Sequence, residues 1–250
     1  MNILLNLYTR LARVVFRRRR NALYIVLLGG PGAGKGTMAT LLSQKLGLPH
    51  LNMGAIFRRE IEAKTAIGLK WGPVIKSGKL CPDHVVMGLL KRELKKPEYN
   101  HGAILDGIPR TVGQSRLLKR ALFIWGVKVS RALFIDVPLP DMIERLSLRR
   151  TCSNKSCGQS FHIKFKPPKV DGVCDACGSP LTQRDDDKPE VVEERMREFE
   201  RTFAELRGDF ESQGILSTVE STNKVSIDEV CQRILFVLEE THCIKCSLGR

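Results

Sequence analysis

The sequence predicts an α/β protein in which helices flank a parallel β-sheet and small subdomains are inserted between the strands. Three observations predict this fold. Short apolar runs alternate with segments of helical periodicity, a glycine-rich loop joins the first run to the first helical segment, and a cysteine-rich stretch interrupts the alternation. Alternating strands and helices are typical of a parallel sheet that is covered on both faces.

The strands are predicted from short, continuous apolar runs, which are typical of strands buried on both faces. The first run spans residues 24–28 and ends in glycines, and two further runs, 103–106 and 132–136, each end in an aspartate. A capping box at Ser226 marks the start of the last helix. Apolar residues at helical spacing predict helices over 38–46, 85–94, 114–122, 141–148, 189–210 and 226–238.

Residues 151–182 have a different character from the rest of the chain. They contain four cysteines, the paired prolines Pro167 and Pro168 and several glycines, and they lack a helical period. We therefore expect a small inserted subdomain here.

The composition excludes several classes of protein. Of 250 residues, 42% are hydrophobic and 27% are charged, which excludes a wholly disordered chain. No run approaches the ~18–20 apolar residues of a membrane-spanning helix. Eight cysteines are too few for a disulfide-stapled mini-domain. The formal net charge of +14 favours an anionic ligand or partner.

The N-terminal segment 1–21 is basic and amphipathic. Residues 1–59 contain no acidic residue, and six arginines fall within the first twenty positions. Such segments are typical of transit peptides, so we expect a mitochondrial location, with a plastid as the alternative. A basic tail on a cytosolic protein, or an arm that contacts an anionic membrane or a larger assembly, would have the same composition.

The glycine-rich loop spans Gly29–Thr37 and has the Gly-x4-Gly-Lys spacing of a P-loop. It follows a predicted strand and precedes a predicted helix. Its glycines let backbone N–H groups converge on phosphate oxygens, and the helix N-terminus adds a positive dipole end. Lys35 is placed to reach a transferred phosphate, and Thr37 is placed to meet Mg²⁺.

The loop closely resembles that of adenylate kinases and other nucleoside monophosphate kinases, which read Gly-x-Pro-Gly-x-Gly-Lys-Gly-Thr. The resemblance runs from about Tyr24 to the C-terminal helix. It implies a P-loop fold with an inserted monophosphate-binding subdomain and a zinc-knuckle lid. The other segments that resemble family motifs are Gly78-Lys79-Leu80 before Pro82-Asp83, Asp106-Gly107-Ile108-Pro109-Arg110, Arg145-x3-Arg149, and Arg184-Asp185-Asp186-Asp187 with Arg195 downstream.

By this resemblance, the extension 1–21 precedes a kinase domain over 22–250. The domain would consist of an acceptor-binding part (52–81), a lid (148–187) and a core made of residues 22–51, 82–147 and 188–250.

The resemblance also implies roles for single residues. ATP would be held by Gly32, Ala33, Gly34, Lys35, Gly36, Thr37, Arg145 and Arg149, with Arg145 against the base. AMP would be held by Arg58, Lys79, Cys81, Gly107, Arg110 and Gln114, with Gln114 on the adenine. The transfer itself would use Lys35, Arg110, Arg149, Arg184 and Arg195. Asp106 would orient Mg²⁺ through its water ligands, while Asp186 and Asp187 would latch the closed lid.

The acceptor segment departs from the family pattern. The family reads Ser-Thr-Gly-Asp, whereas this chain reads Asn52-Met53-Gly54-Ala55, so the acid is absent and a methionine replaces a hydroxyl. Arg58 keeps its place three residues further on.

The inserted subdomain contains two closely spaced pairs of cysteines, Cys152 with Cys157 and Cys174 with Cys177. This pattern is typical of a structural Zn²⁺ site with four thiolate ligands, which leaves no open coordination position for chemistry. Long-lid adenylate kinases carry a zinc knuckle at this place, usually with two residues rather than four within the first pair. Two disulfides or free thiols are the alternatives.

We therefore expect a monomeric phosphotransferase that converts ATP and AMP into two ADP. Another donor and acceptor pair, such as GTP with AMP, is the first alternative. A kinase fold retained as a structural subunit of a larger assembly is the second. Nucleic-acid binding is not expected, because the cysteine-rich segment lacks clustered aromatic residues and base-reading helices.

Overall fold

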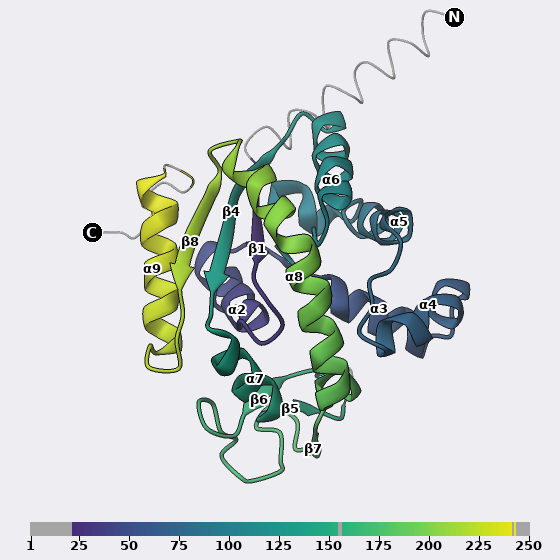
Figure 1. Ribbon diagram of the computed structural model, residues 1–250, viewed down its shortest axis with the longest axis vertical. Coiled ribbons are helices and arrows are strands. Elements are labelled where there is room, and N and C mark those ends of the chain that lie inside the picture. Colours follow the sequence, from purple (N-terminus) through teal and green to yellow (C-terminus); the bar gives the residue numbers. More distant parts are fainter. Residues whose placement is uncertain (1–21, 155–156, 242, 244–250) are drawn as a thin grey trace, which may run out of the picture.

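The computed structural model describes residues 22–154, 157–241 and 243. Its centre is a parallel five-stranded sheet with the order β2-β3-β1-β4-β8 (Figure 1). The predicted α/β class is thereby confirmed, whereas the basic segment 1–21 lies outside the described residues. The strands are β1 (Leu23–Leu28), β2 (His50–Asn52), β3 (Gly102–Asp106), β4 (Val129–Asp136) and β8 (Leu216–Glu220).

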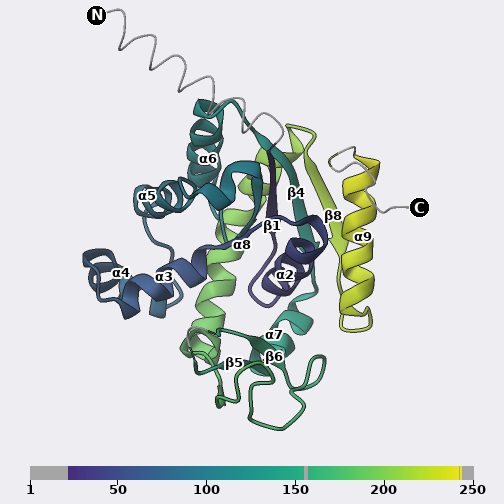
Figure 2. The same ribbon diagram turned by 180° about the vertical axis from the view of Figure 1, so that it is seen from behind.

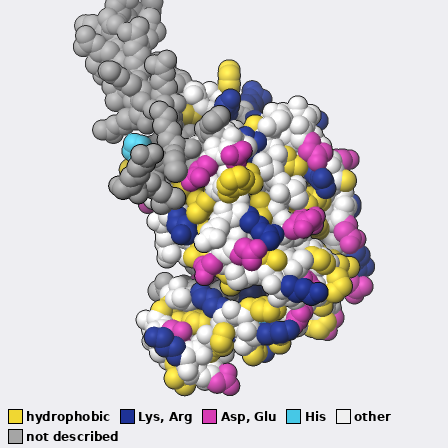
Figure 3. Space-filling model, turned by 90° about the vertical axis from the view of Figure 1, so that its left-hand side faces the viewer, with side chains coloured by type: hydrophobic (Ala, Val, Ile, Leu, Met, Phe, Trp, Pro, Cys, Tyr) yellow, Lys and Arg dark blue, Asp and Glu magenta, His cyan; other side chains and the backbone are white. Residues whose placement is uncertain are grey.

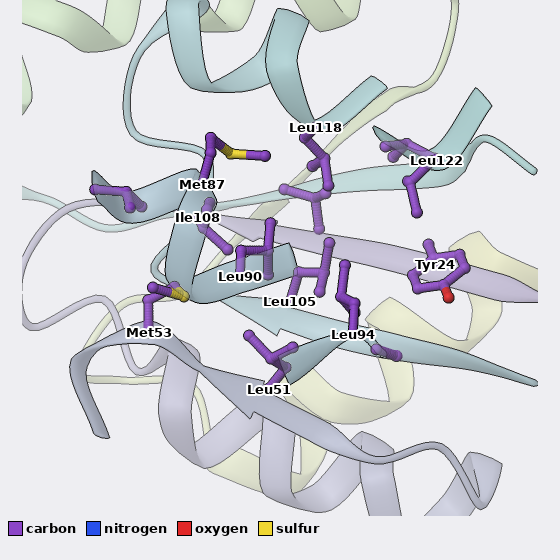
Figure 4. Packing of buried hydrophobic residues seen from close by; sticks show 14 of the residues in the cluster. Tyr24, Leu51, Met53, Met87, Leu90, Leu94, Leu105, Ile108, Leu118 and Leu122 are labelled. Carbon is purple, nitrogen blue, oxygen red and sulfur yellow. The ribbon is translucent and has the colours of Figure 1, made fainter. Parts of the chain in front are cut away.

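Side chains of β1 alternate between two hydrophobic layers, as the pleat of a strand requires. Tyr24 and Val26 pack into one cluster, and Ile25 and Leu27 pack into the other. All four are at most 1% exposed, so β1 is buried on both faces of the sheet. Figure 4 shows the first cluster, in which Tyr24 lies among leucines of the neighbouring strand and helices.

Helices cover both faces of this sheet. The helix α8 lies in front of it in Figure 1, and α2 lies in front of it in Figure 2, where the molecule is seen from behind. The predicted helices are all present, with ends that differ from the expected ones by a few residues. The helices outside the insertions are α2 (Lys35–Leu46), α5 (Asp83–Glu93), the 3₁₀ turn η1 (Pro97–His101), α6 (Val112–Ile124), α7 (Leu139–Ser147), α8 (Pro189–Glu211) and α9 (Ile227–Glu240).

The segment expected to bind the acceptor forms two helices, α3 (Met53–Glu62) and α4 (Ala66–Lys76). Crossed ion pairs fasten α3 to α5. Arg59 on α3 binds Glu93 on α5, while Arg92 on α5 binds Glu60 on α3. Both glutamates are buried, so each carboxylate is held by a cation where little water reaches it.

The segment expected to form the lid contains a small antiparallel sheet of order β6-β5-β7. Figure 3 shows the lower end of the molecule set off from the body by a groove along which Lys and Arg side chains gather. None of the helices in the described part of the chain combines the length and the apolarity that a membrane crossing requires. The elements of this segment are β5 (Arg149–Cys152), β6 (Ser160–His162), β7 (Leu181–Thr182) and the 3₁₀ turn η2 (Asp185–Asp187).

Candidate active site

The P-loop connects β1 to α2, as the sequence predicts. The helix begins at Lys35, directly after Gly34, which has a φ of 83°. Gly32 has a φ of 81°. Residues with a Cβ rarely adopt such positive φ values, so glycine at these two positions lets the loop turn sharply into the helix. The N-terminus of α2 is thereby aimed at the loop, with its positive dipole end toward any bound anion.

Lys35 folds back onto the loop that precedes it. Its Nζ donates hydrogen bonds of 2.7 Å to the carbonyl oxygen of Gly29 and 2.8 Å to that of Gly30. Burial lowers the pKa of Lys35 to about 7, although the negative charge of Asp106 opposes this effect. The site therefore holds a cation that an anionic ligand would stabilise.

The helix α7 packs against the P-loop without free space between them. A Cβ added to Gly30 would lie 2.5 Å from Met142 Sδ, and one added to Gly32 would lie 2.5 Å from the Met142 carbonyl oxygen. Contacts this close leave no room for a side chain. Gly32 is therefore required by packing against the backbone of α7 as well as by the loop conformation, whereas a side chain at Gly30 would have to displace the thioether of Met142.

Asp106 ends β3 beside the P-loop, and it is 5% exposed. Its Oδ2 accepts hydrogen bonds of 2.6 Å from Asn52 Nδ2 and 3.1 Å from His50 Nε2. Burial alone would raise the pKa of Asp106, but the hydrogen bond from His50 and the charge of Lys35 lower it overall. The side chain is therefore a carboxylate at neutral pH, held in place by the neighbouring strand β2.

Arg149 and Arg195 lie on either side of the buried Asp187. Arg149 Nε donates a 2.8 Å hydrogen bond to Asp187 Oδ2, and Arg149 Nη2 binds Oδ1 of the same carboxylate. Arg195 Nη1 lies 3.5 Å from that Oδ1 and 3.2 Å from Asp186 Oδ2. These ion pairs connect the start of β5, the turn η2 and the helix α8.

Arg184 and Arg58 belong to the same cluster of charges. Arg184 Nε donates a 2.8 Å hydrogen bond to Thr151 Oγ1. Burial and the positive charge of Arg149 lower the pKa of Arg184 to about 10. Arg58 is exposed and close enough to Asp186 and Arg149 to interact with both electrostatically.

The cations of this cluster outnumber its acids. Around the P-loop the structure gathers Lys35, Arg58, Arg110, Arg149, Arg184 and Arg195, against Asp106, Asp186 and Asp187. Like charges held together disfavour one another's charged form, and a bound anion relieves this. The arrangement therefore suits an anionic ligand such as a polyphosphate.

The residues expected on the acceptor side are only partly brought together. Arg110 is exposed at the site, and its backbone N–H donates a 2.8 Å hydrogen bond to Oε1 of the buried Gln114. The Arg110 guanidinium also donates to the carbonyl oxygen of Gly107, at 3.2 Å. Cys81 is buried in the hydrophobic core. Lys79 is exposed, and its side chain makes no hydrogen bond or ion pair to the described part of the chain.

Met53, which replaces a hydroxyl residue of the family pattern, does not reach into the site. It is 2% exposed and packs in the first hydrophobic cluster, where Figure 4 shows it near Met87 and Ile108. Asn52 beside it caps α3 by accepting a 2.8 Å hydrogen bond from Ala55 N–H. The departure from the family pattern therefore removes polar groups without blocking the space.

A cavity lies between the P-loop and α8. Lys35, Arg110 and Arg195 line it, together with apolar side chains that include Phe199 and Phe203. The cavity is thus lined by cationic side chains on one part of its surface and by apolar side chains on another. Such a lining suits a ligand that carries both phosphate groups and less polar groups.

Arg145 projects from α7 toward the loop that follows β8. Its guanidinium donates to Asn223 Oδ1 at 2.8 Å and to Ser221 Oγ and the Ser221 carbonyl oxygen at 3.2 Å each. This position is beside the P-loop, because α7 packs on Gly30 and Gly32.

The four cysteines of the inserted subdomain converge. Their Sγ atoms all lie within 4.8 Å of one another. Cys152 Sγ lies 3.4 Å from Cys177 Sγ, and Cys157 Sγ lies 3.7 Å from Cys174 Sγ, so neither pair forms a disulfide. Sulfurs around a tetrahedral Zn²⁺ are about 3.8 Å apart, so the cluster is compatible with a zinc site.

Several polar partners in the site were not predicted from the sequence. His50 and Asn52 hold Asp106, Thr151 binds Arg184, and Ser221 and Asn223 hold Arg145. Of these residues, only Asn52 could have been noticed from the sequence, because it lies in the segment that departs from the family pattern. The others are ordinary polar residues whose role depends on the folded chain.

Adenylate kinases from bacteria are similar to this chain over most of its length. One from Clostridium botulinum (strain 657 / Type Ba4) is 42% identical over 214 residues, which cover 86% of this chain and 97% of the relative. One from Caldicellulosiruptor saccharolyticus is 39% identical over 202 residues, which cover 81% and 93%. One from Thermodesulfovibrio yellowstonii is 40% identical over 216 residues, which cover 86% and 99%.

These relatives correct one prediction made from the sequence. Their source organisms are bacteria, which have neither mitochondria nor plastids, and nothing in the comparison supports a transit peptide. The prediction of a mitochondrial or plastid location is therefore wrong. It depended only on the arginines and the apolar spacing of residues 1–21, and basic amphipathic segments with other roles share those features.

The model of the adenylate kinase family matches residues 27–215. The matched region begins in β1 and ends just before β8, so it includes the P-loop, the arginine cluster and the four cysteines. The relatives and this match agree with the geometry of a site for polyphosphate. The chain belongs to the adenylate kinase family, whose members are phosphotransferases that move a phosphoryl group between nucleotides.

Proposed function

We propose that this protein transfers the γ-phosphoryl group of ATP to AMP, reversibly and with Mg²⁺, to give two ADP. One observation carries the proposal: Lys35 and the arginines converge on the P-loop with too few acids to balance them. A triphosphate and a monophosphate that meet end to end supply the missing negative charge.

The donor would lie on the P-loop. The backbone N–H groups of Gly32–Thr37 would bind its phosphates at the N-terminus of α2, and Lys35 would exchange its carbonyl partners for phosphate oxygens. Arg145 would lie against the base, and Arg149 would reach the transferred group. Arginine suits this place because its guanidinium binds phosphate through two parallel hydrogen bonds.

The acceptor would lie between α3 and the segment that follows β3. Arg58 and Arg110 would bind its phosphate, and Gln114 would bind its base. Gly107, Lys79 and Cys81 complete this proposed set, although Cys81 contributes from the core rather than from an exposed surface.

The reaction needs no covalent bond to the protein. A phosphate oxygen of AMP attacks the γ-phosphorus as the bond from that phosphorus to the β–γ bridging oxygen breaks, so ADP leaves and AMP becomes the second ADP. Lys35, Arg149, Arg184 and Arg195 would stabilise the charge spread over the transferred group. The lid would exclude water, and Asp186 and Asp187 would latch it through their arginine partners.

Magnesium fits the residues beside the P-loop. Asp106 is a buried carboxylate, and its Oδ1 makes no hydrogen bond to a described residue, which leaves an acceptor for a metal-bound water. Thr37 would supply a hydroxyl. When bound, Mg²⁺ would neutralise part of the charge on the phosphate oxygens.

A structural Zn²⁺ is proposed for the lid, with Cys152, Cys157, Cys174 and Cys177 as its ligands. His162, which lies in the same subdomain, is not part of the converging group, and its Nδ1 accepts hydrogen bonds from the backbone of Lys164 and Phe165.

The test is a coupled assay of ADP formation by the full chain with Mg-ATP and AMP. We expect turnover, and a loss of about 10²–10³-fold in Lys35→Ala, as for the removal of one donor to a transition state. GTP in place of ATP, and CMP or UMP in place of AMP, would then define the bases. Absence of turnover with every pair, in protein whose circular dichroism is that of a folded chain, would overturn the proposal in favour of a structural role.

A further inference from the structure

The exposed face of α6 combines arginines with large apolar side chains. Arg116, Arg120 and Ile124 follow one another at intervals of four residues, and Phe123 lies three residues after Arg120. Residues at these intervals lie along one stripe of a helix, here called the α6 stripe. Phe123 is 79% exposed and Ile124 is 59% exposed, and both arginines are exposed as well. Neighbouring apolar groups left in water are typical of interaction surfaces.

The positive charge of the α6 stripe is not balanced by acids on its own helix. Residues 107–135 contain six Lys and Arg and no Asp or Glu. Asp209 of α8 binds Lys119 at 2.8 Å and accepts a 2.6 Å hydrogen bond from Ser115. Neither Arg116 nor Arg120 forms an ion pair with a residue that the structure describes. The stripe is therefore both cationic and apolar.

The basic segment 1–21 is attached at the end of the molecule where α6 ends. Tyr24 of β1 pairs with Val129 of β4, which begins five residues after the last residue of α6, Ile124. Ala22 packs against the first hydrophobic cluster, as do residues of the link between α6 and β4. The segment that precedes Ala22 contains six arginines and no acid. Two basic stretches that are remote in sequence therefore join the body at the same edge of the sheet.

This edge of the sheet lies opposite the candidate active site. The P-loop follows the C-terminal end of β1, and Asp106 ends β3, so the site lies at the carboxyl edge of the parallel strands. Figures 1 and 2 both show α6 toward the end of the molecule that is away from β5 and β6. At this upper end, Figure 3 shows hydrophobic side chains next to Lys and Arg side chains. A partner bound here would leave the phosphate site open.

We propose that the α6 stripe and the segment 1–21 together form a surface that binds an anionic lipid bilayer. A bilayer supplies negative headgroups for the arginines and an apolar layer for Phe123 and Ile124. Coverage of the stripe by the segment 1–21 itself would place arginines against arginines. A second copy bound through the same stripe would do the same, because a two-fold contact brings identical patches together. Charge complementarity therefore favours the lipid surface over both.

The experiment is co-sedimentation of the full chain with vesicles made of equal parts of phosphatidylglycerol and phosphatidylcholine. Vesicles of phosphatidylcholine alone are the neutral comparison. We expect binding to the anionic vesicles only, and weaker binding as the salt concentration rises to about 1 M, where the Debye length falls to about 3 Å.

The chain offers a closely matched pair of double variants. Arg120→Gln with Phe123→Ser should weaken vesicle binding about thirtyfold, because it removes one cation and one apolar group from the α6 stripe. Arg233→Gln with Phe236→Ser is the control, since these residues have the same spacing on α9 and are also exposed. Arg233 is paired with Glu229 at 2.6 Å, so this site is less cationic. The control should lose less than about threefold in binding.

A third variant tests the segment 1–21. Replacement of the four arginines at 17–20 by glutamine should weaken vesicle binding, and the loss should add to that of the α6 variant. All variants should keep the circular dichroism and the rate of ADP formation of the wild type, so vesicle binding is scored separately from catalysis.

Four results would overturn the inference. The first is absence of binding to anionic vesicles, and the second is equal binding to neutral ones. The third is a loss in the α6 variant that is no larger than the loss in the α9 control, which would leave the segment 1–21 as the whole contact. The fourth is a dimer, seen by sedimentation velocity without vesicles, that dissociates in the α6 variant, because a second copy would then cover the stripe.

Discussion

The ammonium group of Lys35 donates a 2.7 Å hydrogen bond to the carbonyl oxygen of Gly29, at the start of its own loop. The carbonyl oxygens of the loop therefore accept the hydrogen bonds that Lys35 would give to a bound phosphate. We expect a phosphate to replace these partners and to stabilise the charge that the free protein disfavours.

Binding of a triphosphate should therefore be accompanied by proton uptake at Lys35. Burial lowers the pKa of Lys35 to about 7 in the free protein, and a neighbouring phosphate raises it. Affinity should be full below that pKa and fall as the pH rises above it. Calorimetry of a non-hydrolysable ATP analogue at about pH 8, in two buffers of different ionisation enthalpy, should reveal the uptake. Lys35→Met should show none, and an affinity independent of pH would contradict the assignment.

Lys35→Met should also stabilise the free protein. Because the pKa of Lys35 is lower in the folded chain than its ordinary value of 10.5, the unfolded chain binds more protons between the two values. The penalty is complete below about 7 and disappears as the pH rises through 10.5. Partial exposure reduces the effect, so we expect a gain of about 1–2 kcal/mol in the free energy of unfolding at neutral pH. Urea titrations at several pH values would measure it; a loss of stability at neutral pH would refute the prediction.

Asp187→Asn should destabilise the fold through the lid. The side chain of Asp187 is 0% exposed and lies between Arg149 and Arg195, so the variant leaves Arg149 without its carboxylate and Arg195 with Asp186 alone. We expect a loss of about 2–4 kcal/mol, measured by urea unfolding. The control is Asp185→Asn, because the pair of Asp185 with Lys188 is exposed and should contribute less than about 0.5 kcal/mol. Equal losses in the free energy of unfolding for the two variants would contradict the prediction that the buried ion pairs of Asp187 contribute more than the exposed pair.

The crossed ion pairs between α3 and α5 predict a second stability effect. Glu60 is 4% exposed, and hydrogen bonds from Thr65 and Arg92 lower its pKa against the opposing effect of burial. Glu60→Gln should lower the free energy of unfolding by about 1–3 kcal/mol at neutral pH, and the difference should shrink as acid protonates the wild-type carboxylate. Glu229→Gln, in the exposed pair with Arg233 on α9, is the matched control and should change stability by less than about 0.5 kcal/mol. The prediction fails if the two variants unfold alike.

Removal of zinc should destabilise the lid. Purified protein should contain about one Zn²⁺ per chain by atomic emission, and a strong chelator should lower the melting temperature. Cys177→Ser should lose the metal, whereas Cys231→Ser, which changes a buried thiol on α9, should keep it. Metal-free wild-type protein with an unchanged melting curve would contradict a structural role for zinc.

Local signals in the sequence predicted the central strands and most helices. The runs that became β1, β3 and β4 are apolar without interruption because those strands lie inside the sheet. The edge strands β2 and β8 were not predicted. The first has only three residues, and the second mixes polar and apolar side chains because part of it faces solvent. The helices α3 and α4 were also missed, and α4 contains Pro73, which interrupts a helical pattern.

The residues of the candidate site also fall into two groups, those that were predicted from the sequence and those that were not. The P-loop and the arginines were predicted because each lies in a segment that resembles a family motif. Their partners were not, because these come from distant parts of the chain: Asn52 is 54 residues from Asp106, and Asn223 is 78 residues from Arg145. Only the folded structure brings such residues within hydrogen-bond distance.

The tight packing of α7 on the P-loop has a mechanical consequence. The helix packs Met142 against Gly30 and Gly32, and it ends at Ser147, shortly before β5 begins the inserted subdomain. Because close-packed groups resist compression, we expect a shift of the P-loop on binding phosphate to be passed on to α7. The C-terminal end of α7 leads directly into β5 of the inserted subdomain. Occupancy of the phosphate site and the position of this subdomain should therefore be mechanically coupled through one short helix.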